Sequence, residues 1–234
     1  MDTENQFRLF VSNVRSLQAH FEELLLMLDS LNSEQLDMIA LTETWVNAEQ
    51  FACHQINGYT QYLQNRHGRK SGGVAVYIRA GLVYEVEEVV ATTFNALKIK
   101  FKTSGREALD FSIIAIYRFC TASKLQFVCE LEKCVESCSG PALLAGDFNI
   151  DLLSLDSSAR LLNLLTPNGF RSLVNEPTRV GYGSSTCLDH VYLRGIQSDC
   201  SRVSASCRVV PVSYSDHSAI FAEVSGLHRA HLVA

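Results

Sequence analysis

Hydrophobic residues follow two different periods along this 234-residue chain. Phe21, Leu24, Leu25, Leu28 and Leu31 recur at helical spacing, which predicts an amphipathic helix. Short apolar runs bounded by polar turns predict strands instead. On this basis we expect strands near residues 7–11, 38–41, 74–78, 96–101, 111–117, 142–145, 188–193, 202–210 and 218–224, and further helices near 123–138 and 158–165.

The order of these elements predicts one α/β domain over residues 1–234. A strand–helix–strand unit opens the chain, a run of strands follows, and a second helix–strand unit begins near residue 123. No linker or repeat divides the sequence, and 47% of its residues are hydrophobic with only 4 prolines, which excludes a disordered chain. Two packed mixed β-sheets flanked by helices suit this pattern, with a ligand site where strand ends converge.

Neither membrane insertion nor secretion is predicted. The longest apolar stretches, such as residues 111–117, fall far short of the ~18 residues that a spanning helix requires. The first six residues are acidic and polar with no apolar segment behind them, so we expect an intracellular protein. The 8 cysteines include no Cys-x-x-Cys pair, which favours reduced structural thiols over a zinc site.

Four acidic residues stand directly after apolar strands or inside them: Glu43, Asp147, Asp189 and Asp216. A carboxylate there is costly to desolvate unless it is paired, hydrogen-bonded or bound to a cation. Each alone could be a cap or turn residue, but independent caps are not expected to recur in this way. The pattern predicts a site for a divalent cation such as Mg²⁺. The net charge of −5 therefore does not exclude nucleic acid, since acids around a cation lower the net charge while the local field stays positive.

Six short motifs follow one another between Asn13 and His217. They are Ser-Asn-Val-Arg at 12–15, Leu-Thr-Glu-Thr-Trp at 41–45, Ile-Tyr-Arg at 116–118, Gly-Asp-Phe-Asn at 146–149, Leu-Asp-His-Val at 188–191 and Ser-Asp-His-Ser at 215–218. Together they resemble the endonuclease/exonuclease/phosphatase superfamily. With Pro-Thr-Arg at 177–179, the chain most resembles the apurinic-endonuclease-like domain of LINE-type (non-LTR) retrotransposon polyproteins. It departs from that pattern at Phe119, where many relatives have proline, and in a segment 179–188 that is short for a DNA-groove hairpin.

The resemblance implies a four-layer α/β sandwich of the deoxyribonuclease I-like kind. It also implies that Glu43 binds Mg²⁺, with Mn²⁺ as an alternative ion. Asn13 would be a second oxygen donor or a hydrogen-bond support, and Asp216 a metal or leaving-group contact. The residues that the resemblance assigns to DNA contacts are Arg15, Arg118, Thr178, Arg179 and Ser215.

The same resemblance assigns the catalytic roles. Asp147 would accept a proton from the attacking water or orient it, and Asn149 would hold that water or the phosphate. His217, oriented by Asp189, would donate to a phosphate oxygen, and the Tyr117 phenol would be a further donor. Trp45, which follows Glu43, is expected to pack against other residues, and His190, next to Asp189, is expected to be either a structural or a surface histidine. Two interpretations of the basic loop 66–70 stay open: a contact with a DNA backbone and an ordinary solvated loop.

The implied function is a Mg²⁺-dependent endonuclease that nicks one strand of double-stranded DNA. The 3′-hydroxyl that it leaves would prime reverse transcription at a chromosomal target. No reverse transcriptase motif is present, so we expect an excised domain of a larger polyprotein with a fused reverse transcriptase, translated in the cytoplasm and acting in the nucleus. The alternatives are a superfamily member that acts on phosphoinositides, sphingomyelin or poly(A), and an inactive domesticated domain that only binds DNA. The filled catalytic positions argue against the second.

Overall fold

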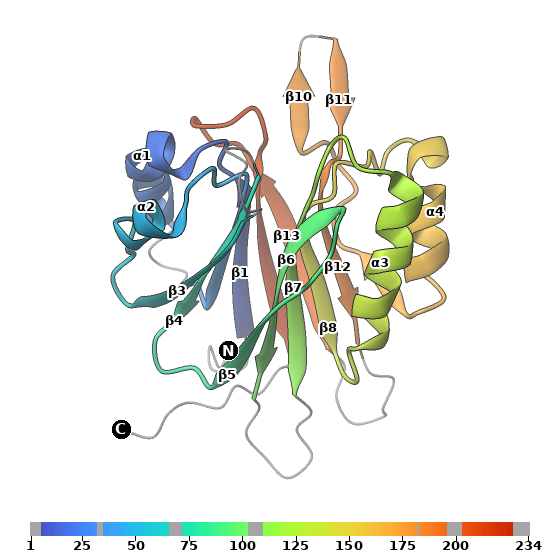
Figure 1. Cartoon of the computed structure of the whole chain (residues 1–234), viewed down its shortest axis with the longest axis horizontal. Helices are drawn as coiled ribbons and strands as arrows, with labels where there is room; N and C mark the ends of the chain where they lie inside the picture. Colours follow the sequence, from blue (N-terminus) through green and yellow to red (C-terminus); the bar gives the residue numbers. More distant parts are fainter. Residues whose placement is uncertain are drawn as a thin grey trace.

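The chain folds as two six-stranded sheets that pack face to face, with helices on both outer sides (Figure 1). The computed structural model describes residues 6–31, 35–65, 72–102, 110–181, 183–195 and 203–226. Strands β1 and β2 of the first sheet are parallel, and its other neighbouring strands are antiparallel. This sheet has the order β13-β14-β1-β2-β4-β3 and consists of β1 (Gln6–Asn13), β2 (Met38–Thr42), β3 (Tyr59–Gln64), β4 (Val74–Arg79), β13 (Ser204–Val210) and β14 (Ala219–Ser225).

The second sheet repeats this plan, with β7 and β8 as its parallel pair. It has the order β5-β6-β7-β8-β12-β9 and consists of β5 (Tyr84–Glu88), β6 (Phe94–Phe101), β7 (Phe111–Arg118), β8 (Ala142–Asp147), β9 (Phe170–Ser172) and β12 (Asp189–Arg194). A separate hairpin of β10 (Arg179–Gly181) and β11 (Ser184–Thr186) projects from the upper edge in Figure 1. The short segment 179–188 therefore does form a hairpin.

Helices cover the outer face of each sheet. The first sheet is covered by α1 (Leu17–Ser30) and α2 (Ala48–Ala52), and the second by α3 (Lys124–Glu136) and α4 (Leu155–Leu165) (Figure 1). Each helix begins after a polar residue whose side-chain oxygen accepts a backbone hydrogen bond from the first turn. These caps are Ser16, Asn47, Ser123 and Ser154.

Three hydrophobic layers hold the four structural layers together. The central layer joins Val76 of the first sheet to Ile113 of the second. One outer layer includes Leu24 of α1 and the other includes Phe127 of α3. The predicted four-layer α/β sandwich is therefore confirmed.

Burial explains which elements the sequence predicts. All eight residues of β7 are buried because both faces of that strand are covered, and its apolar run is correspondingly continuous. The edge strands β3 and β5 mix half-buried and exposed residues, so their sequences carry no such run. The elements not predicted are α2, β3, β5, β9, β10 and β11.

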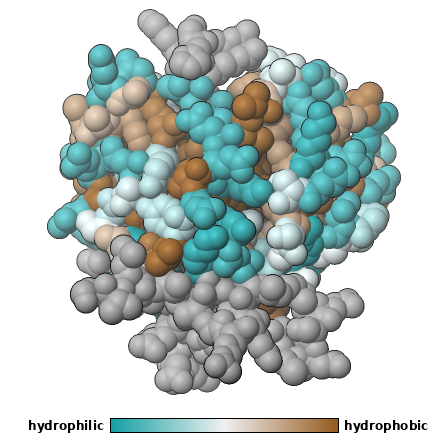
Figure 2. Space-filling view, turned by 60° about the horizontal axis from the view of Figure 1, so that its bottom comes forward, coloured by the Kyte–Doolittle hydropathy of each residue, from teal (hydrophilic) through white to brown (hydrophobic). Residues whose placement is uncertain are grey.

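Two expectations from the sequence concern the length of apolar helices and the state of the cysteines. None of the helices in the described ranges has the length and apolar character needed to span a bilayer. The cysteines at 53, 120, 129, 134, 138, 187 and 207 are free thiols, as expected, and Cys200 lies outside the described residues. The lower end of the molecule is mainly hydrophilic where it is coloured, with hydrophobic residues in separate areas (Figure 2).

Candidate active site

Strand ends of both sheets meet at the upper edge in Figure 1. Asn13 ends β1, Asp147 ends β8, and Glu43 directly follows β2. The Asn13 side-chain amide donates hydrogen bonds to Glu43 Oε1 at 3.1 Å and to Asp147 Oδ2 at 2.9 Å. Because Asn13 and Glu43 come from the first sheet and Asp147 from the second, these bonds join the two sheets at the site.

Four polar residues form a row across neighbouring strands of the second sheet. Backbone register pairs Asn95 of β6 with Tyr117 of β7, Tyr117 with Asp147 of β8, and Asp147 with Asp189 of β12. Register partners share a face of the sheet, on strands about 4.8 Å apart. The Tyr117 hydroxyl also donates to Glu43 Oε1 at 3.4 Å. Asn95 was not among the predicted site residues, and its amide between the buried apolar residues Phe94 and Ala96 is the signal that could have found it.

His217 is paired with the last acid of this row. Its Nδ1 lies 2.7 Å from Asp189 Oδ2, and both side chains are buried. Burial alone would lower the pKa of His217, but the hydrogen bond to Asp189 and the charge of that carboxylate outweigh it and raise the pKa to about 8. The imidazole is therefore mostly protonated at neutral pH, and its Nε2–H is a second donor beside the acids.

Asp147 is fully buried next to a second acid. Its Oδ1 accepts the backbone N–H of Asn149 at 2.8 Å, and its Oδ2 accepts the Asn149 side-chain amide at 3.3 Å. Asn149 has a φ of 48°, a left-handed conformation that Asn tolerates better than most residues. Burial first, and the charge of Asp189 next, raise the pKa of Asp147 well above its usual range. A carboxyl with a raised pKa can accept a proton near neutral pH, as a general base must.

A glycine lets the strands that carry Tyr117 and Asp147 come close. Gly146 has a φ of 135°, and a Cβ at this position would lie 2.0 Å from the carbonyl oxygen of Ile116 on β7. Any side chain here would push β8 away from β7 just before Asp147. The spacing of the row therefore depends on this glycine.

The family model of Endonuclease/Exonuclease/phosphatase matches residues 10–217, a range that includes every residue of this polar cluster. The chain belongs to the endonuclease/exonuclease/phosphatase family. Its fold is that of phosphodiesterases and phosphatases, so the family assignment indicates a hydrolase. Among the curated proteins, no match to the chain is found.

Several solved structures share the fold of this family member. The endonuclease domain of TRAS1, a telomere-specific non-LTR retrotransposon, superposes with a TM-score of 0.70 at 14% identity, over 94% of this chain and 99% of that one. A humanized D. rerio TDP2 gives a TM-score of 0.70 at 15% identity, with the same coverage of 94% and 99%. A 3′ phosphatase from Neisseria, bound to a product DNA hairpin, gives 0.63 at 15% identity, over 92% and 98%. At these identities the likeness establishes the fold.

Enzymes with this family fold depend on a divalent metal, and the donor set here fits one. Asp147, Asp189 and His217 bring possible ligand atoms within 4.8 Å of one another, and while His217 is protonated the two carboxylates are the members of this group that could bind a cation. The Oδ1 atom of Asp189 is buried and has no hydrogen-bond partner among the described residues, so a polar group can still bind there. Glu43 is only partly buried, which leaves its carboxylate accessible from solvent. Asn13 was expected to be either an oxygen ligand or a hydrogen-bond support. Its amide nitrogen donates to Glu43 and Asp147, which corresponds to the second of these roles.

Two residues expected to contact DNA are instead buried supports of this family site. The Arg118 side chain donates from Nη1 to the Asn149 carbonyl at 3.1 Å and from Nη2 to the Ala122 carbonyl, and the residue is 2% exposed. The hydroxyl oxygen of Thr178 accepts the backbone N–H groups of Leu188 and Asp189, both at 3.0 Å. The expectation fails for both because a sequence does not reveal that these polar groups bind backbone atoms inside the fold.

Two predicted contacts, Arg15 and Arg179, lie at the rim of the site, where both pair with Asp216. Arg15 Nη1 lies 2.7 Å from Asp216 Oδ1, and Arg179 Nη2 lies 2.8 Å from Asp216 Oδ2. Asp216 was expected to be a metal or leaving-group contact, and in the structure its two oxygens bind guanidinium groups. Ser215 accepts the backbone N–H of His217 through its hydroxyl oxygen at 3.2 Å. Asp216 therefore belongs to this rim of half-exposed arginines and not to the group of buried acids.

Three other features were singled out in the sequence: His190, Trp45 and the basic loop 66–70. His190 takes the structural one of its two expected roles, since its ring is buried and stacks on Phe148 at 4.8 Å. Trp45 was expected to pack against other residues, and 38% of it is exposed. The basic loop 66–70 lies outside the described residues.

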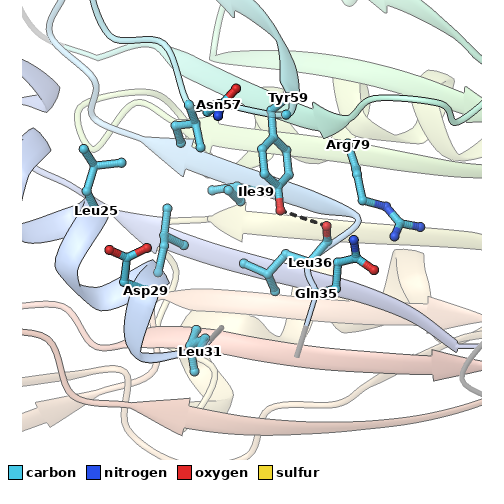
Figure 3. A pocket seen from close by; sticks show the side chains of 12 residues that line it. Leu25, Asp29, Leu31, Gln35, Leu36, Ile39, Asn57, Tyr59 and Arg79 are labelled. Atoms are coloured by element: carbon cyan, nitrogen blue, oxygen red, sulfur yellow. Dashed lines mark hydrogen bonds between the residues drawn. The ribbon is translucent and has the colours of Figure 1, made fainter. Parts of the chain in front are cut away.

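A separate cavity lies at the opposite edge of the first sheet (Figure 3). It has a volume of about 520 Å³ and is lined by the end of α1 together with residues such as Tyr59 and Arg79. The Tyr59 hydroxyl donates to the Leu36 carbonyl at 2.9 Å, and Arg79 is paired with Asp37. The Tyr59 phenol and the Arg79 guanidinium of this lining thus already have partners within the protein.

Proposed function

We propose that this chain is a metal-dependent endonuclease that nicks one strand of double-stranded DNA. The observation that carries the proposal is the hydrogen-bonded cluster of Asn13, Glu43 and Asp147 beside the Asp189–His217 pair. It combines an accessible carboxylate, a buried base and a protonated imidazole within one small space. Those three groups meet the needs of phosphodiester hydrolysis, which must activate water and neutralise charge on phosphate.

Each residue has a defined chemical part in this proposal. Asp147 orients the attacking water and accepts its proton, while Asn149 holds the carboxyl in place. The His217 imidazolium donates to a non-bridging phosphate oxygen, where negative charge builds in the transition state. Burial first, and the charge of Glu43 next, raise the pKa of Tyr117, so its phenol keeps its proton and is a second donor.

Glu43 is the residue that we propose as the principal ligand of Mg²⁺ or Mn²⁺. A bound divalent ion supplies positive charge beside the phosphate and lowers the pKa of neighbouring acids. Asn13 fixes the orientation of Glu43 relative to Asp147, since the same amide binds both carboxyls. The chain's own residues thus preorganise the site before DNA arrives.

We further propose that the chain acts as the endonuclease of a non-LTR retrotransposon. This part of the proposal is supported by the sequence motifs and by the shared fold of the TRAS1 endonuclease domain. In that context the water oxygen bonds to phosphorus as the bond between phosphorus and the 3′ oxygen breaks, which leaves a 5′-phosphate. The 3′ oxygen takes up a proton from solvent, and the resulting 3′-hydroxyl primes reverse transcription by a fused polymerase. The protein would be made in the cytoplasm and would act on chromosomal DNA in the nucleus.

The test is a plasmid-nicking assay with the purified chain, with Mg²⁺, with Mn²⁺ and with EDTA. We expect supercoiled plasmid to become open circular only with a divalent ion, and the nick to be extended directly by a DNA polymerase. Release of phosphate from DNA 3′ ends or from inositol phosphates, without nicking, would favour a phosphatase of the same family. DNA binding without any hydrolysis would favour the inactive domesticated domain.

A further inference from the structure

Strand β3 forms an open edge of the first sheet. It is the last strand in the order of that sheet and pairs only with β4, from Tyr59 opposite Arg79 to Gln64 opposite Val74. The backbone groups on its outer side therefore have no partner in a ladder, as on any edge strand. Edges of this kind are the places where an extended peptide can add a strand to a sheet.

Two residues of β3 direct their backbone groups to this outer side. The Ala80 N–H donates to the Gly58 carbonyl at 2.8 Å, which makes these two residues a hydrogen-bonded pair. Bonded and non-bonded pairs alternate along an antiparallel ladder, so the backbone groups of Gln61 and Leu63 point away from β4. Among the residues that the structure describes, nothing else binds the backbone of Gln61 or Leu63 on that side.

Two hollows follow the outer edge of β3, and we call this edge with its hollows the β3 groove. The first hollow, of about 600 Å³, is lined by residues 55–61, and the second, of about 450 Å³, by residues 61–65 together with α2 and β5. The lining residues of the second hollow from these two elements are Ala48, Phe51 and Ala52 of α2, and Glu88 of β5. The open backbone of β3 is therefore accompanied by space in which a further strand can lie.

The two sides of the β3 groove differ in chemistry. Gln61 and Leu63 face α2, since Gln61 Nε2 donates to the Phe51 carbonyl at 3.1 Å and Leu63 packs in the same hydrophobic layer as Phe51. Tyr62 faces the second sheet, where its hydroxyl lies 3.3 Å from the Tyr84 hydroxyl of β5. A strand beside β3 alternates in the same way, so its successive side chains meet α2 and β5 in turn.

The β5 side of the groove is acidic. Glu85, Glu87 and Glu88 are all exposed on this strand. Glu85 is paired with Lys102 at 3.2 Å, whereas Glu88, which lines the groove, has no ion pair among the described residues. Neither hollow has a lysine or an arginine among its described lining residues. The groove therefore offers a negative charge on this side, which complements a basic side chain.

We propose that the β3 groove binds an extended segment of a partner protein in which apolar and basic side chains alternate. The segment adds a strand to the first sheet through hydrogen bonds with the backbone of Gln61 and Leu63. Its apolar side chains lie against α2, and its lysines or arginines face Glu88. The main-chain bonds give affinity, and the two sides of the groove give selectivity. No residue of the catalytic cluster takes part, so this binding is independent of the nuclease function.

The experiment measures the binding of a labelled heptapeptide of alternating lysine and valine to the purified chain by fluorescence anisotropy. One control peptide has two adjacent prolines at its centre, and another has glutamate in place of every lysine. The variants of the chain are Glu88→Lys, Gln61→Pro and the control Glu132→Lys, which makes the same charge change on α3, over the other sheet. Proline at position 61 removes an outward N–H and breaks no bond of the β4 ladder. Plasmid nicking and thermal melting are measured for each variant.

We expect the lysine–valine peptide to bind the parent chain and to slow hydrogen exchange over residues 59–65. Glu88→Lys should weaken binding about tenfold, because attraction is replaced by repulsion. Gln61→Pro should also weaken it about tenfold, through the loss of a main-chain hydrogen bond. Glu132→Lys should bind like the parent, and none of the three variants should change nicking.

Equal binding of the proline peptide would overturn strand addition, because that peptide keeps the charge and loses main-chain donors. Equal binding of the glutamate peptide would overturn the charge complementarity. No binding of the lysine–valine peptide would overturn the proposal, and a dimer of the chain that Gln61→Pro dissociates would then identify a second copy as the occupant. If Gln61→Pro lowers the melting temperature, the peptide series and Glu88→Lys still decide. Peptide binding by a chain that nicks nothing would refute the proposed function and leave the groove in place.

Discussion

Buried acids lie at both edges of the sandwich, but the groups that pair with them differ between the two edges. At the lower edge, Asp37 precedes β2 and is fully buried, with Arg79 Nη2 2.7 Å from one carboxylate oxygen and the Arg8 backbone N–H 2.8 Å from the other. At the upper edge, Asp147 and Asp189 lie side by side and are held by neutral amides and one histidine. Burial is equally costly at both edges, but only the lower edge carries a fixed guanidinium to offset it.

The difference shows how to tell a structural acid from a functional one. Asp37 is neutralised by the protein itself, so its edge needs nothing from outside. At the upper edge the His217 imidazolium pairs with Asp189, whereas Asp147 has no ion pair among the described residues and its pKa is raised by burial and by the charge of Asp189. The four predictions below test this contrast, from the largest expected effect to the smallest.

Asp147→Asn should reduce plasmid nicking by about 10³-fold, because it removes the proposed base while keeping the side chain's size. Its melting temperature should not fall, since the variant removes an acid that is buried beside another acid. DNA affinity should also be kept, as measured by anisotropy in EDTA. Parent-level nicking by the purified variant would mean that a contaminating nuclease or another centre is responsible.

Asp37→Asn should do the reverse. Loss of one partner of a buried ion pair costs about 3–5 kcal/mol of unfolding free energy, because Arg79 is left uncompensated. Urea denaturation measures this change, and kcat per folded molecule should stay at the parent value. A double change, Asp37→Leu with Arg79→Met, should recover much of the loss. An equally large fall in stability for Asp147→Asn would break the contrast between the edges.

Asp189→Asn should lower nicking about 100-fold near neutral pH by removing the anchor of His217. The pKa of His217 should fall from about 8 toward its ordinary value of about 6.5, because the raising hydrogen bond and charge are lost. A histidine is charged below its pKa, so the deficit should be larger at pH 8 than at pH 6. Imidazole NMR shifts measured without metal follow the pKa directly. An unchanged His217 pKa would contradict the assigned pairing.

Glu130→Gln is the smallest test and concerns an acid held by hydroxyls. Burial alone would raise the pKa of Glu130, but hydrogen bonds from Thr92 and Thr93 outweigh it and lower the pKa. A lowered pKa in the folded state gives stability that is complete above the unfolded value of about 4.3 and is lost as pH falls through the folded value. We expect a deficit of about 1 kcal/mol at pH 7 that shrinks in acid, with nicking unchanged. A deficit independent of pH would show that the charge plays no part.

Much of the fold could be predicted because burial leaves a clear pattern. Strand β8 and the apolar run of β7 have both faces covered, and their sequences are correspondingly apolar. The acids after such runs could also be placed at one edge, since parallel strands end on the same side. Edge strands such as β5, YEVEE, carry alternating polar residues that resemble a surface loop.

The parts of the site that could not be predicted depend on which atoms a polar group reaches. Arg118 and Thr178 looked like DNA contacts, but the folded chain directs them to backbone carbonyl and amide groups. The polar side chain of Asn95 stands out in the sequence of β6, but its place in the row depends on its register with Tyr117, which no local motif encodes. The pairing of Asp216 with two arginines joins positions 201 and 37 residues apart in the sequence.

Backbone pairing fixes the positions of Tyr117, Asp147 and Asp189 in the site, whichever side chains occupy them. Backbone ladders of β7, β8 and β12 set the separation of the three side chains, so exchanging one of them changes the chemistry at that point and leaves the others where they were. A change at Gly146 would instead displace the ladder itself, because the carbonyl of Ile116 occupies the space that a Cβ would need. The reaction of this protein can therefore be altered by exchanging these side chains one at a time, provided that Gly146 of β8 is kept.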